Sequence, residues 1–139
     1  MAEHTADFAT AAAALGPVLR LFDSLAGRHL GGTWLRHEHG SLAEVVLDFG
    51  ALYLAAIADG DCDTLRIELR TEETFAGFSD GSSTTPWSHH LGQPFSWGWL
   101  TMNKQGYVDG ALLGFGDDIY PKVALNVIAS EIKVGAVTF

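Results

Sequence analysis

Two stretches of the chain, residues 27–50 and 92–116, carry the same landmarks at almost the same spacing. The landmarks are glycines and large apolar residues, which are typical of turns and of buried strand positions. The first copy has Gly27, Trp34-Leu35, Gly40 and Phe49-Gly50, and the second has Gly92, Trp99-Leu100, Gly106 and Phe115-Gly116. This echo predicts two related β units of about four short strands each, which have to pair or pack together because four strands alone bury too little surface.

The predicted buried faces of the two units also correspond. Val45, Leu47 and Phe49 alternate with polar or exposed positions in the first unit, and Ala111, Leu113 and Phe115 take the same places in the second. Duplication of one unit explains this match, and so does convergence, because amphipathic hairpins in general combine glycine turns with alternating apolar residues.

The chain of 139 residues fits a single domain. Residues 1–26 read as a helical segment that ends at Gly27, a residue that favours the left-handed end of a helix. Alternating residues predict the first β unit in residues 27–70 and the second in residues 94–139. Residues 71–93 form the connecting loop, and their polar part, residues 79–86, is expected to be mobile. The expected fold is α+β, with the helix packed on an antiparallel sheet of about six to eight strands.

The charge of the chain limits its partners. Seventeen acidic residues against eight basic ones give a net charge of −9. Nucleic-acid binding needs clustered Lys and Arg, and the eight bases here are scattered, so we expect no nucleic-acid partner. The acidity favours encounter with a basic protein. The apolar runs are shorter than a membrane span, the start lacks the pattern of a secretory signal, and the single cysteine fits a reducing compartment, so the expected location is cytoplasmic.

One candidate metal site lies in the first unit. His37 and His39 stand two residues apart, so on a strand both side chains would point to one side, and Glu44 follows shortly after. The spacing from Gly31 to Gly50 through these residues resembles the first metal-binding motif of the cupin family, a resemblance that implies a divalent metal inside a β-barrel. The second cupin motif is missing, because no histidine follows His90. A solvated hairpin end is the competing interpretation.

The densest cluster of informative residues is the aromatic run that opens the second unit. On a regular strand Phe95, Trp97 and Trp99 share one face, which is typical of a core and, where it is exposed, of a protein interface. A polar edge follows the run, and the predicted interface residues are Trp97, Trp99, Asn103, Gln105, Tyr107 and Asp109.

At this run the chain resembles an uncharacterised family of small bacterial α+β proteins. The matching residues are Trp97-x-Trp99, Asn103-x-Gln105-Gly106-Tyr107-x-Asp109 and Phe115-Gly116-Asp117, and the resemblance covers residues 22–137. It implies a fold and no assigned activity. By analogy, compact acidic proteins of this size serve as immunity partners of secreted toxins.

The sequence contains no nucleophile elbow and no phosphate-binding glycine motif. We therefore expect a non-enzymatic binding protein without a cofactor, which acts through a protein interface, in the manner of an immunity-like inhibitor of a basic toxin or effector. Two alternatives stay open: a metal-dependent, cupin-like protein that uses His37, His39 and Glu44, and a carrier of a small ligand held between the helix and the sheet. The sequence does not indicate the oligomeric state.

Overall fold

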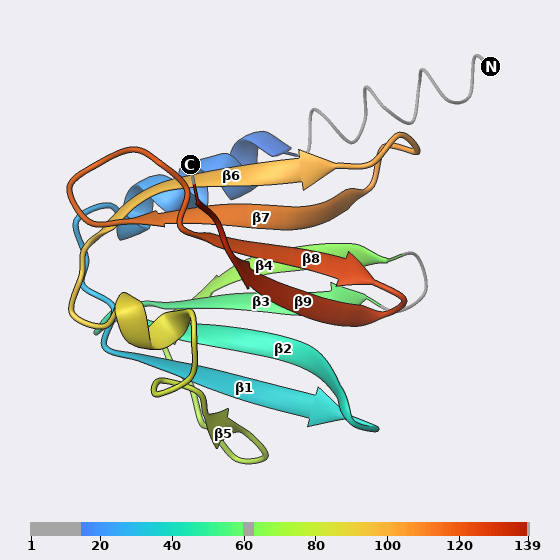
Figure 1. Ribbon diagram of the computed structural model, residues 1–139, viewed down its shortest axis with the longest axis horizontal. Helices are drawn as coiled ribbons and strands as arrows, with labels where there is room; N and C mark the ends of the chain where they lie inside the picture. Colours follow the sequence, from blue (N-terminus) through green and yellow to red (C-terminus); the bar gives the residue numbers. More distant parts are fainter. Residues whose placement is uncertain (1–14, 60–62, 139) are drawn as a thin grey trace.

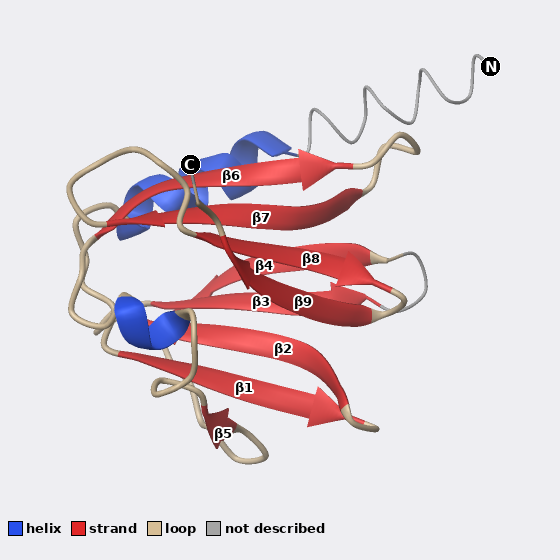
Figure 2. Ribbon diagram, viewed as in Figure 1, coloured by secondary structure: helices blue, strands red, loops and turns tan. Residues whose placement is uncertain are grey.

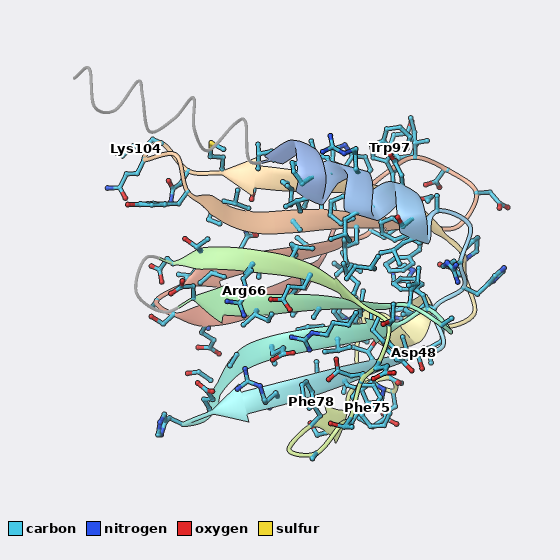
Figure 3. All side chains as sticks on the ribbon, turned by 180° about the vertical axis from the view of Figure 1, so that it is seen from behind. Asp48, Arg66, Phe75, Phe78, Trp97 and Lys104 are labelled. Carbon is cyan, nitrogen blue, oxygen red and sulfur yellow. The ribbon has the colours of Figure 1, made fainter. Side chains whose placement is uncertain are left out.

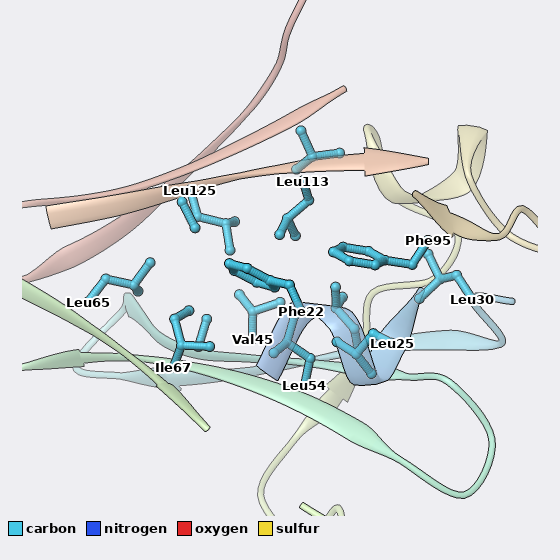
Figure 4. Close-up of a cluster of buried hydrophobic side chains, with 14 of the residues drawn as sticks. Phe22, Leu25, Leu30, Val45, Leu54, Leu65, Ile67, Phe95, Leu113 and Leu125 are labelled. Atoms are coloured by element: carbon cyan, nitrogen blue, oxygen red, sulfur yellow. The ribbon is translucent and has the colours of Figure 1, made fainter. Parts of the chain in front are cut away.

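The computed structural model describes residues 15–59 and 63–138 (Figure 1). Residues 15–25 are helical, and Gly27 follows with a φ of 81°, as expected for the end of a helix. The remainder of the predicted helical segment, residues 1–14, lies outside the described residues. The helix runs beside strand β6 (Phe95–Met102) and directs Phe22 and Leu25 into the core (Figures 1 and 4).

The first β unit forms a sheet of five strands in which neighbours along the chain are neighbours in space. Its members are β1 (Gly32–Glu38), β2 (Ser41–Asp48), β3 (Tyr53–Asp59), β4 (Thr64–Arg70) and the short β5 (Ser79–Asp80). The order β4-β3-β2-β1-β5 makes the first four strands an antiparallel meander and places β5 next to β1, at the edge opposite β4. The connection from β4 to β5 therefore has to cross the whole sheet.

The second β unit forms a separate sheet of four strands. It contains β6, β7 (Val108–Phe115), β8 (Val123–Ile128) and β9 (Glu131–Ala136), again as an antiparallel meander in the order β6-β7-β8-β9. A short 3₁₀ helix, η1 (Trp87–His89), lies between the two units along the chain (Figure 2). Its Trp87 is buried in the core.

The core lies between the inner faces of the two sheets, and the helix contributes to it from one side (Figure 4). The predicted inner faces are confirmed: Val45, Leu47, Phe49, Ala111, Leu113 and Phe115 belong to one buried cluster, and each is at most 3% exposed. Around them Phe22, Phe49, Phe95 and Phe115 make stacked or edge-on ring contacts. The predicted α+β class, a helix packed on antiparallel β-structure, is thereby confirmed.

The echo in the sequence has a direct structural counterpart. Each of its glycines adopts the left-handed conformation that glycine tolerates best, with φ between 79° and 95°: Gly27 and Gly92, Gly40 and Gly106, and Gly50 and Gly116. Each pair occupies the same place in the two four-strand meanders. The two units thus share turn geometry and strand order as well as their sequence landmarks.

Two details differ from the sequence-based expectation. The described residues contain nine strands in two sheets, because the two units face each other instead of joining into one sheet of six to eight strands. The expected mobile loop over residues 79–86 is also wrong. Ser79 and Asp80 pair with β1, and the side-chain hydroxyl of Ser82 accepts a hydrogen bond from the backbone N–H of Thr33 at 2.9 Å, so this segment is tied to the sheet.

Candidate protein-binding surface

Strand β6 does not keep its three aromatic residues on one face, as the alternation had predicted. Phe95 pairs with Phe115 and Trp97 with Gly114, so two residues advance on β6 where one advances on β7. This β-bulge at Ser96 reverses the alternation. Phe95 is therefore 1% exposed in the core, whereas Trp97 is 54% exposed on the outer face of the second sheet.

Trp97 and Trp99 lie side by side on that outer face. Their ring centroids are 6.4 Å apart and the ring planes are tilted by 47°. Gly98 between them faces inward against the ring of Phe22. Exposed tryptophans are the side chains that most often dominate binding at protein interfaces, because they bury much apolar area at little cost in entropy.

A row of four residues extends from Trp99 across all four strands of the second sheet, in hydrogen-bonded register. We call it the second-sheet row: Trp99, Leu112, Ala124 and Gly135. All four residues are partly exposed. The side chains shrink from an indole on β6 to none on β9, and a Cβ on Gly135 would meet no atom within 4 Å. The apolar surface of the row therefore becomes lower from β6 to β9, and it is open to solvent at Gly135.

The first sheet has an equivalent row, but that row is covered. The echo aligns Trp34 with Trp99, and the register extends the first-sheet row through Trp34, Val46, Ala55 and Glu68. Val46 and Ala55 face away from the core and are nevertheless 0% exposed. The two sheets therefore share a layout on their outer faces and differ in what lies on top.

The cover of the first sheet is the connection between β4 and β5, residues 71–78, which we call the crossing segment. Its Phe75 (labelled in Figure 3) stacks on Trp34 with ring centroids 4.3 Å apart and an interplanar angle of 15°. Phe75 also contacts Tyr53 edge-on at 6.0 Å. Phe78 packs edge-on against Phe75. The segment crosses the outer face because its ends are fixed at opposite edges of the sheet.

Acidic and apolar residues of one loop border the second-sheet row beside Trp97. A Cβ on Gly114 would lie 3.2 Å from the carbonyl oxygen of Tyr120 and 3.4 Å from that of Trp97, so the loop after β7 runs directly next to the start of β6. In this loop Ile119 is 69% and Tyr120 56% exposed. Sequence reasoning missed both residues, because an apolar pair inside the predicted second β unit gives no sign that it belongs to an exposed loop.

Two hydrogen bonds favour the charged form of Asp118 in this loop. Lys122 Nζ donates to Asp118 Oδ2 at 3.1 Å, and the backbone N–H of Tyr120 donates to Asp118 Oδ1 at 3.1 Å. These hydrogen bonds, the one from Lys122 first, lower the pKa of Asp118 below its usual value. Asp117 precedes it on the exposed side of the loop. Beside Trp97 the surface is therefore both aromatic and acidic.

The six predicted interface residues separate into two groups. Trp97 and Trp99 belong to the outer face just described, while Asn103, Gln105 and Tyr107 form the turn at the opposite end of the β6–β7 hairpin, as the positions of Trp97 and Lys104 in Figure 3 illustrate. Asn103 Oδ1 accepts hydrogen bonds from the backbone N–H groups of Gln105, at 2.9 Å, and of Tyr107, at 3.2 Å. The side chain of Asn103 therefore stabilises the turn.

Asp109, the last of the six, also has a local role. It stands at a second irregularity in the pairing of β6 with β7, and its Oδ1 accepts a hydrogen bond from Thr101 Oγ1 at 2.8 Å. The 44% exposed ring of Tyr107 is the one large apolar surface that the turn group presents to solvent. This makes Tyr107 a natural control for Trp97.

The three residues of the metal hypothesis occupy different environments. His37 is an exposed residue next to the end of β1, and His39 lies in the following turn with a φ of 52°, so the expectation that both imidazoles point the same way from one strand is wrong. The carboxylate of Glu44 is buried and binds Arg36 Nε and Nη2 at 3.1 and 3.0 Å and Arg70 Nη1 at 2.8 Å. The described residues contain no group of three or more His, Cys, Asp or Glu side chains placed to hold a metal ion.

Glu44 instead belongs to an ionic network that fastens the crossing segment. Arg70 Nη1 also donates to Glu73 Oε2 at 2.9 Å, so one guanidinium joins β2 to the segment above it. Burial lowers the pKa of Arg70, but hydrogen bonds to Glu73 and Glu44 outweigh this effect and raise it, which keeps the guanidinium charged. The bases 36 and 70 are too far apart in the sequence for this network to be recognised there.

A separate cavity of about 340 Å³ lies between the helix and the edges of the two sheets. Its wall is mainly apolar and combines helix, β4 and β6–β7 residues, among them Leu15, Val18, Leu65, Ile67, Leu100 and Val108. A cavity of this size and lining can hold a small apolar molecule.

Fold and surface together define a class: a two-sheet α+β protein with one outer face sealed by its own chain and the other left with a row of partly exposed apolar side chains. The chain belongs to a family of unknown function, DUF6334, whose model matches residues 19–138. The expected membership of an uncharacterised family is thereby confirmed. No curated protein and no solved structure matches the chain significantly. Within the described part of the chain, no helix is long and apolar enough to pass through a membrane.

Proposed function

We propose that this protein is a non-enzymatic binding module whose partner is a basic protein, and that it acts as an immunity-like inhibitor of a basic toxin or effector. The observation that carries the proposal is Trp97, a tryptophan 54% exposed next to Trp99 on an uncovered sheet face with acids at its border. Monomeric proteins seldom leave such a combination exposed without a partner, because a bare aromatic surface favours aggregation.

The charge distribution supports a basic partner. Among the described residues, five basic side chains are held in ion pairs with acids of the same chain: Arg36, Arg66, Arg70, Lys122 and Lys133. Neighbouring acids therefore already offset most of the basic side chains, and the remaining acids give the chain its net charge of −9. Such a field speeds the encounter with a cationic surface and is screened by salt beyond about 10 Å at 0.1 M.

The proposal is tested by affinity capture at low ionic strength with three forms of the full chain. Wild type, Trp97→Ala and the matched control Tyr107→Ala are used as baits in lysate of cells that express the gene. We expect a basic protein that wild type and Tyr107→Ala retain, that Trp97→Ala loses, and that elutes as salt is raised. The proposal is wrong if no captured protein depends on Trp97, or if those that do are acidic.

The cavity beside the helix supports a second candidate function, that of a small-ligand carrier. Its apolar lining and its volume of about 340 Å³ fit a small hydrophobic molecule better than a charged metabolite. A thermal-shift screen of apolar and polar compounds tests this idea, because a ligand that binds only the folded state raises the unfolding temperature. Stabilisation by apolar compounds should disappear in Leu100→Trp, which fills the cavity, and persistence there would exclude this site.

A further inference from the structure

The first sheet shows how a face of this layout is filled. The crossing segment lies over the first-sheet row, stacks Phe75 on Trp34 and leaves Val46 and Ala55 0% exposed. It joins β4 to β5, which are four strand spacings apart in the sheet, a span of about 19 Å at the usual strand spacing, which about six extended residues can cover. A short segment that stacks an aromatic ring on the tryptophan is therefore sufficient to cover such a row.

The second sheet repeats the layout without a cover. Trp99 matches Trp34, Leu112 matches Val46 and Ala124 matches Ala55, yet these three residues of the second sheet are partly exposed. The described residues contain no counterpart of the crossing segment over this face. Trp97 takes the place of Gly32 of the first sheet and adds a second indole beside the position where an aromatic ring would stack.

The differences between the two rows favour the close approach of a partner's backbone to the second sheet. Where the first-sheet row ends in Glu68, the second-sheet row ends in Gly135, above which there is open space. A strand position without a side chain permits close approach of another backbone. A segment that enters there would pass over Ala124 and Leu112 before it reaches the two tryptophans, and the loop that carries the exposed Asp117 and Asp118 runs next to the start of β6.

We propose that the outer face of the second sheet binds an extended segment of the partner that carries an aromatic residue with lysine or arginine next to it. The aromatic ring stacks on Trp99 as Phe75 stacks on Trp34, and the basic side chain meets the acids beside Trp97. This inference rests on the proposed function, since it describes how the basic partner is held. It assigns a role to residues that the aromatic run in the sequence did not include, Leu112, Ala124 and Gly135.

The probe is a library of random peptides of twelve residues displayed on phage and selected at low salt on the full chain. Selection on wild type is followed by counter-selection on Ala124→Arg, which places a long cation in the middle of the row. The matched control is Ile128→Arg, because Ile128 lies on the same strand, is 56% exposed and follows Ala124 by four residues, outside the second-sheet row. The two variants change the charge equally and are first compared with wild type for folding by circular dichroism.

We expect selected peptides to contain a Phe, Tyr or Trp flanked by Lys or Arg. Their affinity should fall by about tenfold or more in Ala124→Arg and change by less than about twofold in Ile128→Arg. The reason is that residues at the centre of an interface contribute most of the binding free energy. In NMR spectra the amides of residues 99, 112, 124 and 135 should shift on binding. Peptides without aromatics, or affinities that Ala124→Arg leaves unchanged, overturn the inference.

Failure of this inference and failure of the proposed function give different results. If a basic protein is captured through Trp97 and Ala124→Arg still captures it, the function stands and the segment-binding mode falls. If peptides bind across the row but no basic protein depends on Trp97, the site stands and the proposed function falls. A dimer in sedimentation that Ala124→Arg dissociates would show that a second copy occupies the face, which also overturns the inference.

Discussion

The close contact between strand β6 and the helix provides the sharpest test of the packing. A Cβ built on Gly98 would lie 2.5 Å from both Cγ and Cδ2 of Phe22. Carbon atoms in contact normally stay about 3.5–4.0 Å apart, so Gly98→Ala forces this ring to move by about 1 Å. The ring is 4% exposed and stacks on Phe95 at 5.9 Å, and therefore has little room to move.

Overpacking of this kind costs about 1–3 kcal/mol, and the loss of unfolded-state entropy on replacing glycine by alanine returns about 0.4–1 kcal/mol. We therefore expect Gly98→Ala to lower the free energy of unfolding by about 1–2 kcal/mol. Gly135→Ala is the matched control, because a Cβ there meets nothing within 4 Å, and it should be neutral or slightly stabilising.

Urea unfolding followed by tryptophan fluorescence measures both variants. Adding Phe22→Leu to Gly98→Ala should recover part of the loss, so that the double-mutant cycle gives a coupling energy of about 0.5 kcal/mol or more. Equal stability of the Gly98→Ala and Gly135→Ala proteins, or additive effects in the cycle, would refute the conclusion that Gly98 is required to admit the ring of Phe22.

Three further predictions concern charge and exposure. Glu44→Gln keeps the shape of a buried side chain but removes the charge between two guanidinium groups, and urea unfolding should show a loss of about 1.5–3 kcal/mol; an unchanged midpoint would contradict this. Trp97→Ala should change stability by less than about 0.5 kcal/mol, whereas Trp87→Ala, which empties a core position, should cost about 3–5 kcal/mol, and the reverse order would contradict the assignment of exposure. Because the folded pKa of Asp118 is lowered, its stabilising contribution is present above the unfolded value of about 3.9 and is lost as pH falls through the folded pKa. Lys122→Gln should raise that pKa in an NMR titration of the carboxyl group, and no change would show that Lys122 does not lower it.

Most strands could be predicted from the sequence because their signals are local. Leu65, Ile67 and Leu69 alternate with charged residues, and this segment is β4. The glycines of the echo mark turns because the left-handed conformation excludes most other residues, and each of them has a positive φ. Period and turn chemistry belong to the residues themselves, so one sequence is sufficient to locate such elements.

The bulge in β6 could not be predicted in this way. A bulge is a mismatch between two strands, and nothing in the residues from Phe95 to Trp99 shows that two of them face one residue of β7. Since a shift of one residue turns side chains to the other face, this single irregularity places Trp97 on the outer face while Phe95 stays in the core. The candidate binding surface is thus the part of the molecule that local pattern describes least well.

The role of the crossing segment was equally hidden. Residues 71–78 belong to the predicted connecting loop, and their covering position follows only from the placement of β5 at the edge opposite β4. The same is true of Glu44, whose two guanidinium partners come from β1 and β4 and meet only when the sheet forms. Such long-range features depend on strand order, which the echo left open between one sheet and two.

The comparison of the two sheets also explains why the aromatic surface is not simply a poorly packed part of the fold. The same chain does cover a row of this kind on the first sheet, where Phe75 and the ion pair from Arg70 to Glu73 hold the crossing segment in place. On the second sheet the chain has an indole in place of Gly32 and a glycine in place of Glu68, which makes the uncovered face more apolar at one edge and more accessible at the other. Both differences increase the free energy available to an incoming segment and neither improves the solubility of the isolated protein. A sheet face that was exposed only because it lacked a cover should instead carry polar or charged side chains, as exposed positions of soluble β-proteins usually do.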